Sequence, residues 1–238
     1  MIVLLTPTGG RPDQIKLCER WMQNQDYKGE VLWVIVDDCE VKTTENIKRD
    51  GWLIKRIFPT PSWQPGQNTQ ARNMAVGINY IKTLSDIEAI FIIEDDDYYK
   101  SIYLTTMMGK LKGYYLAGEL YTVYYNVRLR SWMRNGNDTW SSLFQTVFTP
   151  AVIPILESIY QHRYIDYHLF PAVARKNIFK GNDLGVGIKG QNGRCGIGAG
   201  HKELASYKAD PNGAKLYELI GDDVKYYIND WDSNNILH

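Results

Sequence analysis

The residues of this chain with the clearest chemical potential are four consecutive acids, Glu94-Asp95-Asp96-Asp97, which directly follow the apolar run 89–93. Two carboxylates about 5 Å apart repel each other by about 3 kcal/mol at an effective dielectric constant of about 20. A cation relieves that repulsion, and hard oxygen ligands of this kind suit Mg²⁺ or Mn²⁺. The cluster therefore predicts a divalent metal site, with a solvated acidic turn or a helix N-terminus as the alternative.

The apolar run determines where these acids lie. Five apolar residues without alternation are typical of a strand that is covered on both faces in a parallel sheet. The acids then stand at the carboxyl end of that strand, where open α/β sheets bind their ligands. Because Mg²⁺ and Mn²⁺ often bridge to substrate phosphates, we expect a phosphate-containing ligand at this edge.

The first hundred residues alternate between strand and helix patterns. Strands are predicted at residues 2–5, 31–36 and 52–57, a helix is predicted to begin near Pro12, and apolar residues at helical spacing predict another helix over 71–81. Such alternation favours an α/β fold with a mainly parallel central sheet and helices on both faces.

Polar motifs stand at two further strand ends and at the start of the second helix. They are the turn Thr6-Pro7-Thr8-Gly9-Gly10-Arg11, the pair Asp37-Asp38 and the segment Gln70-Ala71-Arg72-Asn73-Met74-Ala75. With the acidic run, and in this order, they resemble the glycosyltransferases of the GT-A fold, especially the family-2-like group. The resemblance covers residues 1–105 and implies that this half binds a nucleotide sugar. Residues 106–238 of the same domain are then expected to supply the acceptor site and a catalytic loop.

The resemblance also implies an activity and a donor site. The activity is metal-dependent transfer of a sugar from a nucleotide-diphosphate sugar, with a UDP-sugar as the expected donor, to a hydroxyl acceptor. The implied donor residues are Asp38, which hydrogen-bonds the nucleobase, Thr6, Pro7 and Arg11, which shape the base pocket, and Arg72, which reaches base or phosphate. From the residues alone, Asp38 could instead cap a helix and Arg72 could be a surface arginine.

The metal ligands implied by the resemblance belong to the DxD motif. Asp96 is the expected principal ligand of Mn²⁺ or Mg²⁺, with Asp95 or Asp97 beside it, because Glu94-x-Asp96 and Asp95-x-Asp97 both satisfy the motif. A metal in this place would stabilise the negative charge that develops on a diphosphate leaving group, without needing a proton donor.

A glycine-rich segment, residues 185–201, is the second anomaly of the sequence. Each glycine costs conformational entropy, so we expect a mobile loop that closes over a ligand rather than a packed element. The segment resembles the flexible loop with which many GT-A enzymes cover the donor. This implies that His201 is a further metal ligand, with a surface histidine as the alternative, and that Lys189 and Arg194 pair with the diphosphate.

A general base for the acceptor hydroxyl is sought among the remaining acids. Residues 164–169 resemble the acidic acceptor-side segment of inverting GT-A enzymes, which makes Asp166 the first candidate and Asp183 the second. Such a base removes the hydroxyl proton as the sugar carbon is attacked. Asp166 could instead cap a helix, and an enzyme that retains configuration would need no such base.

The acceptor prediction depends on the distribution of charge. The chain has no net charge, yet residues 98–137 hold six basic residues and one acid, and residues 161–202 hold seven basic residues and two acids. Residues 128–140 interleave arginines with tryptophans, a pattern that is typical of nucleic-acid binding, although tryptophans also stack on carbohydrates and the segment could be an ordinary strand. The pattern resembles viral transferases that glycosylate hydroxymethylated bases in DNA. A saccharide acceptor, or a nucleic-acid or sugar-binding module without turnover, is the alternative.

Composition sets the background for these predictions. A chain of 238 residues with 44% apolar residues can bury the core of one large α/β domain. Three widely spaced cysteines without a CxxC pair argue against a disulfide scaffold and for a reducing cytoplasm. The sequence also lacks a signal-peptide pattern and a run of about 18 apolar residues, so no membrane span is expected.

Overall fold

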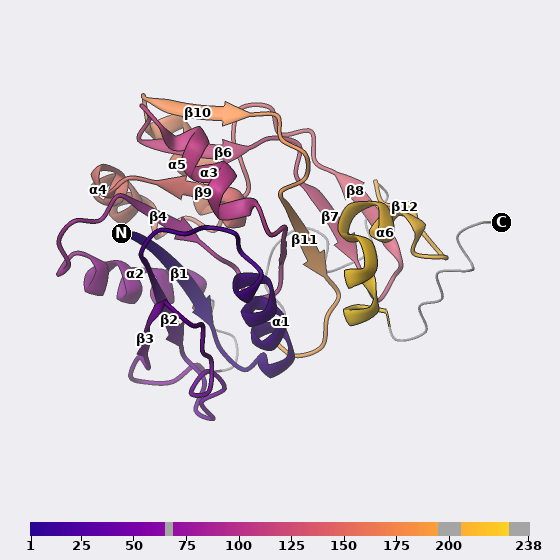
Figure 1. The fold of residues 1–238 in the computed structure, drawn as a ribbon, viewed down its shortest axis with the longest axis horizontal. Coiled ribbons are helices and arrows are strands. Elements are labelled where there is room, and N and C mark those ends of the chain that lie inside the picture. Colours follow the sequence, from indigo (N-terminus) through magenta and orange to yellow (C-terminus); the bar gives the residue numbers. More distant parts are fainter. Residues whose placement is uncertain (65–68, 195–205, 229–238) are drawn as a thin grey trace.

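The computed structural model describes residues 1–64, 69–194 and 206–228, and it contains two β-sheets with covering helices (Figure 1). The strands of the first sheet are β1 (Ile2–Thr8), β2 (Val31–Asp37), β3 (Leu53–Ile57), β4 (Ala89–Ile92), β6 (Leu116–Glu119), β9 (Thr146–Phe148) and β10 (Lys176–Phe179). Those of the second sheet are β5 (Tyr98–Tyr99), β7 (Val123–Asn126), β8 (Ser131–Arg134), β11 (Gly185–Lys189) and β12 (Lys208–Ala209). The α-helices are α1 (Pro12–Gln23), α2 (Gln70–Ile81), α3 (Tyr103–Leu111), α4 (Ile153–Ile159), α5 (Ile165–Ala172) and α6 (Ala214–Ile220).

The first sheet is mainly parallel, as the sequence predicts. Its order is β10-β6-β9-β4-β1-β2-β3, and among its described strands β9 runs antiparallel to both neighbours, β4 and β6. The strands predicted at 2–5, 31–36 and 52–57 are present as β1, β2 and β3, and α1 begins at Pro12 as expected. The helix predicted over 71–81 is α2. The α/β prediction is therefore confirmed.

Both faces of the first sheet are buried. Along β4, Ala89 and Phe91 pack with α1 and α3 on one face, and Ile90 and Ile92 pack with α2 and α5 on the other. All four side chains are completely buried. The unbroken apolar run therefore forms a strand that is covered on both faces, as its pattern predicts.

The second sheet contains the main departure from the sequence prediction. Its order is β12-β8-β7-β11-β5, and in Figure 1 it stands to the right of the first sheet, beside α6. Residues 185–189 were expected to begin a mobile loop, but they form the fully buried strand β11. The glycines serve close packing there: a Cβ at Gly187 would overlap the Tyr124 ring, and one at Gly185 would lie 2.9 Å from the Phe144 ring.

Two further observations concern the described part of the chain. None of its helices combines the length and the apolar character needed to cross a membrane. Cys18 and Cys39 are free thiols, and Cys195 lies outside the described residues.

Candidate functional site

The sheet brings the predicted strand ends together. Thr8, at the end of β1, pairs in register with Asp37, at the end of β2, and its hydroxyl donates a hydrogen bond to Asp95 just beyond β4. Asn73 on α2 joins the group, because its side-chain amide donates to the Thr8 carbonyl at 3.2 Å and to Asp38 Oδ2 at 2.9 Å. Parallel strands place their carboxyl ends at one edge, so motifs far apart in the sequence become neighbours.

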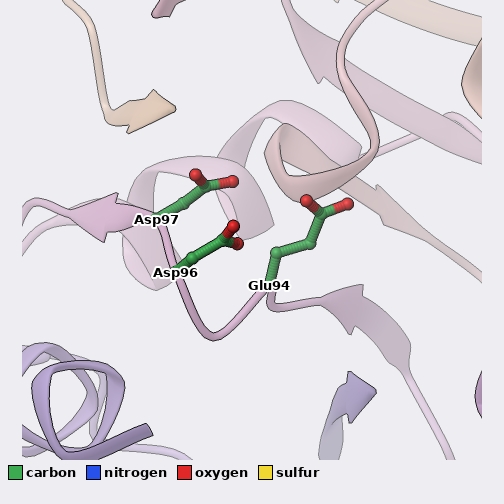
Figure 2. Close-up of side chains that lie close together, drawn as sticks. All are labelled: Glu94, Asp96 and Asp97. Atoms are coloured by element: carbon green, nitrogen blue, oxygen red, sulfur yellow. The ribbon is translucent and has the colours of Figure 1, made fainter. Parts of the chain in front are cut away.

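Three of the four consecutive acids form one cluster. One carboxylate oxygen each from Glu94, Asp96 and Asp97 lies within 4.8 Å of the others, and Figure 2 shows these side chains along the loop that follows β4. Asp95 is used differently, since its buried carboxylate accepts from the Thr8 hydroxyl and forms an ion pair with Arg11. The structure thus places Glu94, and not Asp95, beside Asp96 and Asp97.

Two basic side chains offset part of the acidic charge. The guanidinium of Arg11, a residue that is predicted to shape the base pocket, pairs with Asp95 and, at 3.1 Å, with Asp96 Oδ2. Lys189 is buried, with its Nζ 3.2 Å from Asp97 Oδ1 and 4.0 Å from Asp96 Oδ2. Four carboxylates less two cations leave two negative charges when all are ionised, which is the charge that one divalent ion would balance.

Burial makes this charge unfavourable without a further cation. It raises the pKa of Glu94 to about 7, against the lowering effect of Lys189, and it also raises the pKa of Asp97. Burial alone would lower the pKa of Lys189, but Asp97, Asp96 and Glu94 raise it above its ordinary value. Lys189 therefore stays charged within the cluster.

The donor atoms of the cluster fit a hard divalent cation. Asp97 Oδ1 accepts from the Ile188 amide at 2.9 Å and from Lys189. Asp97 Oδ2 is buried and has no hydrogen-bond partner among the described residues. Such an orphaned oxygen, beside Glu94 and Asp96, is what a Mg²⁺ or Mn²⁺ site requires. The predicted ligand His201 lies outside the described residues.

The Asp38 carboxylate forms a second part of the site. It is buried and is contacted by Asn73 through Oδ2 and by Arg194, whose Nη2 lies 2.7 Å from Oδ1. The guanidinium carbon of Arg194 lies 4.7 Å from the centroid of the Trp63 ring. Arg194, which is predicted to pair with a diphosphate, here contacts Asp38, the residue that is predicted to hydrogen-bond the nucleobase.

The other predicted donor residues lie nearby in the fold but make structural contacts. The hydroxyl of Thr6 accepts from the indole nitrogen of Trp33 at 2.9 Å, and Pro7 is buried within β1. Arg72 stands in the first turn of α2 and donates to the carbonyl of Pro61. These contacts are all within the protein, so the roles of Thr6, Pro7 and Arg72 in donor binding stay predictions.

Asp166, the first predicted base, is linked to the acidic cluster through its charge. It stands in the first turn of α5 and is half-buried, and burial raises its pKa to about 6 although the Tyr167 amide donates to it at 3.0 Å. Its charge in turn contributes to the raised pKa of Glu94, so the two carboxylates are electrostatic neighbours. A carboxylate with this pKa is ionised at neutral pH and can accept a proton.

Asp183 is held in a different contact. Both of its oxygens are engaged by Arg134, at 2.7 Å and 2.9 Å, in a bidentate pair between exposed parts of the chain. Its charge raises the pKa of Glu119, and among the described contacts none joins Asp183 to the acidic cluster. Of the two predicted bases, Asp166 is the one whose charge contributes to the pKa of a cluster carboxylate, and both roles stay predictions.

Three residues of the site, Thr8, Asn73 and Trp63, have no role in the sequence prediction. Thr8 and Asn73 lie in the predicted motifs but had no individual role, although each is a polar residue at a strand or helix end, and Glu94 was considered only as one register of the DxD motif. Trp63 carried a weaker signal: it is an aromatic residue in a polar, proline-rich loop that has no apolar periodicity to explain it.

The fold of the chain is similar to that of known proteins, although neither a family model nor a curated protein sequence matches it. The crystal structure of Staphylococcus aureus TarS superposes with a TM-score of 0.53 and 12% identity, covering 99% of this chain and 41% of TarS. The structure of TarS residues 1–349 in complex with UDP-GlcNAc gives a TM-score of 0.51 and 12% identity, covering 92% of this chain and 64% of that one.

The chain thus spans less than two thirds of the length of either structure. Similarity at 12% identity establishes a shared architecture and leaves the activity to be argued from the site. The mainly parallel sheet, the helices on both of its faces and these neighbours show that the chain has the GT-A glycosyltransferase fold.

Proposed function

We propose that this protein is a metal-dependent glycosyltransferase that moves a sugar from a UDP-sugar to a hydroxyl acceptor. The observation that carries the proposal is the cluster of Glu94, Asp96 and Asp97 at the carboxyl end of β4 in a GT-A fold. A TarS structure of the same fold was obtained in complex with UDP-GlcNAc, which supports a UDP-sugar as the donor.

The acidic cluster would hold Mn²⁺ or Mg²⁺ through Glu94, Asp96 and Asp97. When bound, the ion supplies positive charge for the diphosphate leaving group. Asp95, Arg11 and Lys189 have supporting roles, since they fix the neighbouring carboxylates by buried hydrogen bonds and ion pairs. The DxD motif is thereby read in the register Glu94-x-Asp96, with Asp97 as the third ligand.

Asp166 is the proposed general base of an inverting transfer. Its carboxylate takes the proton of the acceptor hydroxyl while the hydroxyl oxygen forms a bond to the anomeric carbon. The bond from that carbon to the diphosphate oxygen breaks, and its electron pair leaves with the nucleoside diphosphate. A pKa of about 6 keeps Asp166 ionised at pH 7 and still basic enough to accept a proton.

The acceptor is a hydroxyl group, and two classes can be compared. A hydroxymethylated DNA base was expected from the arginine- and tryptophan-rich segment 128–140. In the structure the Nζ atoms of Lys208 and Lys215 lie over the Trp132 ring, 5.1 Å and 4.8 Å from its centroid, and Arg134 pairs with Asp183. These contacts give Trp132 and Arg134 a structural explanation, so these two residues do not favour DNA over a saccharide.

The experiment is to offer labelled UDP-sugars with Mn²⁺ to the purified protein, together with hydroxymethylated DNA or with simple saccharides. Transfer to either acceptor, with release of UDP, supports the proposed activity, and transfer to saccharides alone rejects the DNA acceptor. Tight binding of UDP and Mn²⁺ without transfer or donor hydrolysis would show a binding module instead. If nucleoside diphosphates with Mn²⁺ leave the melting temperature unchanged, the donor site itself is rejected.

A further inference from the structure

The Arg194 side chain makes the kind of contacts that a bound ligand would make. Its guanidinium carbon lies over the Trp63 ring, 4.7 Å from the ring centroid, and its Nη2 donates to Asp38 Oδ1 at 2.7 Å. The backbone amide of Trp63 donates to the Asp38 carbonyl at 2.8 Å, which holds the ring beside the carboxylate. A flat group thus lies over an aromatic ring and at the same time donates a hydrogen bond to a carboxylate.

A nucleobase could make the same two contacts as this guanidinium, one with the Trp63 ring and one with Asp38. It is planar, it stacks on aromatic rings, and uracil presents a ring N–H that a carboxylate can accept. Asn73 already occupies Asp38 Oδ2, so Oδ1 is the oxygen that meets the guanidinium. Gly9 leaves room for the contact, because a Cβ there would overlap Asp38 and lie 2.7 Å from Arg194 Nη2.

We propose that Trp63 is the stacking partner of the donor base, and that Arg194 occupies the base position and must leave it when the donor binds. The inference rests on the proposed function, since it concerns the nucleoside part of a UDP-sugar. The guanidinium and the base cannot both stack on Trp63 and bind Asp38 Oδ1. The apparent affinity for the donor is therefore reduced by the fraction of molecules in which Arg194 holds the position.

The residues before Arg194 connect this contact to the acidic cluster. Gln191 donates through its side-chain amide to the Asp96 carbonyl at 2.6 Å, and Gln14 on α1 donates to the Asn192 carbonyl. The segment therefore remains tied to the metal site on one side when Arg194 leaves Asp38. The released guanidinium is then close to the place where the diphosphate is expected, and it can pair with phosphate oxygens.

The test compares uridine, which has the base but no phosphate, with UDP in the presence of Mn²⁺. In the Arg194→Met variant, uridine is expected to bind about tenfold more tightly than to the wild type, because the competing side chain has gone. The matched control is Arg20→Met, since the Arg20 guanidinium also covers an aromatic ring, at 4.1 Å from the centroid of Tyr226 on another part of the surface. The control should leave uridine affinity unchanged.

The outcomes separate this inference from the proposed function. Uridine affinity that is unchanged or weaker in Arg194→Met, while both proteins bind UDP, overturns the inference and leaves the transferase proposal standing. If neither protein binds UDP with Mn²⁺, the proposed function fails, and this inference fails with it.

A second pair of variants tests the role of Trp63. In the Arg194→Met background, Trp63→Ala should weaken uridine binding about tenfold, which is within the range for losing one base–aromatic stack. Trp63→Phe should restore most of the affinity, because a smaller ring still stacks. Equal uridine affinity for the alanine and tryptophan forms, with the fold intact by circular dichroism, would reject Trp63 as the stacking partner.

Discussion

At the scale of single residues, Lys189 and Arg11 determine how much negative charge the site keeps. Both are buried beside the acids, and the Coulomb attraction of those acids raises both pKa values despite the opposing effect of burial. Arg11 pairs with Asp95 and Asp96, and Lys189 pairs with Asp97 and Asp96, while Asp97 Oδ2 has no hydrogen-bond partner among the described residues. The candidate metal site is therefore a partly satisfied ion-pair network.

Asp96→Asn tests the central ligand of this cluster. The change removes one charged oxygen ligand but keeps the side-chain size, so sugar transfer should fall at least about a hundredfold while the fold is retained. The Mn²⁺-dependent rise in melting temperature should shrink in parallel. Asp138→Asn, at an exposed position, is the control that should behave as the wild type. Wild-type turnover of Asp96→Asn at saturating donor and Mn²⁺ would remove Asp96 from the metal site.

Asp166→Asn tests the proposed base against its rival. Loss of the carboxylate should lower kcat by about 10²- to 10⁴-fold, since an amide cannot take the acceptor proton, while the dissociation constant for UDP stays the same. Asp183→Asn breaks the pair with Arg134 and should retain most of the transfer rate. The measurement is steady-state transfer together with UDP binding for both variants. The reverse ranking of the two variants would assign the base to Asp183.

At the scale of elements, β11 explains how the second sheet reaches the site. Val186 and Ile188 point into the core, and the strand ends at Lys189, which is thereby fixed against Asp97. On the parallel neighbour β7, Tyr124 is in register with Gly187, so its ring lies over the glycine. The glycines of β11 allow the aromatic side chains of β7 to pack closely against it. This packing positions the Lys189 ammonium group beside the acidic cluster.

Gly187→Ala tests this packing. The added methyl group would overlap the Tyr124 ring and should lower the unfolding free energy by about 1–3 kcal/mol, the usual cost of overpacking. Gly109→Ala is the matched control, because Gly109 lies in α3 with nothing within 4 Å of an added Cβ, and alanine favours helices. Urea unfolding of both variants provides the measurement. Equal stability of the two variants would show that the glycine is not needed for packing.

At the scale of the whole molecule, local patterns predicted the first half of the fold well and contacts between distant segments decided the rest. The run 89–93 and the helix from Pro12 carry their own periodicity, so their structure was predictable. The strand β11 was not, because its glycines are explained only by rings from other parts of the chain. The contact of Arg194 with Asp38 joins residues 156 positions apart, and no sequence pattern encodes it.

Glu119 connects the two sheets through hydrogen bonds, and its buried carboxylate makes the unfolding free energy of the protein depend on pH. It ends β6 of the first sheet and accepts hydrogen bonds from the amide of Leu184, just before β11, and from the Gln145 side chain, at 2.9 Å and 2.7 Å. Burial outweighs these bonds and raises its pKa from 4.5 to about 7. The folded protein therefore favours the protonated form more than the unfolded chain does.

Glu119→Gln should remove this pH dependence. With the folded pKa above the unfolded value, the contribution of Glu119 to stability is fully present below about pH 4.5 and is lost as the pH rises through about 7. Between pH 5 and pH 8 the wild type should lose about 2 kcal/mol of unfolding free energy relative to Glu119→Gln, as measured by urea unfolding at each pH. Glu157→Gln, at a solvent-exposed pair with Lys82, is the control. A constant difference in unfolding free energy between wild type and Glu119→Gln across this range would mean that the carboxylate titrates normally in the folded protein.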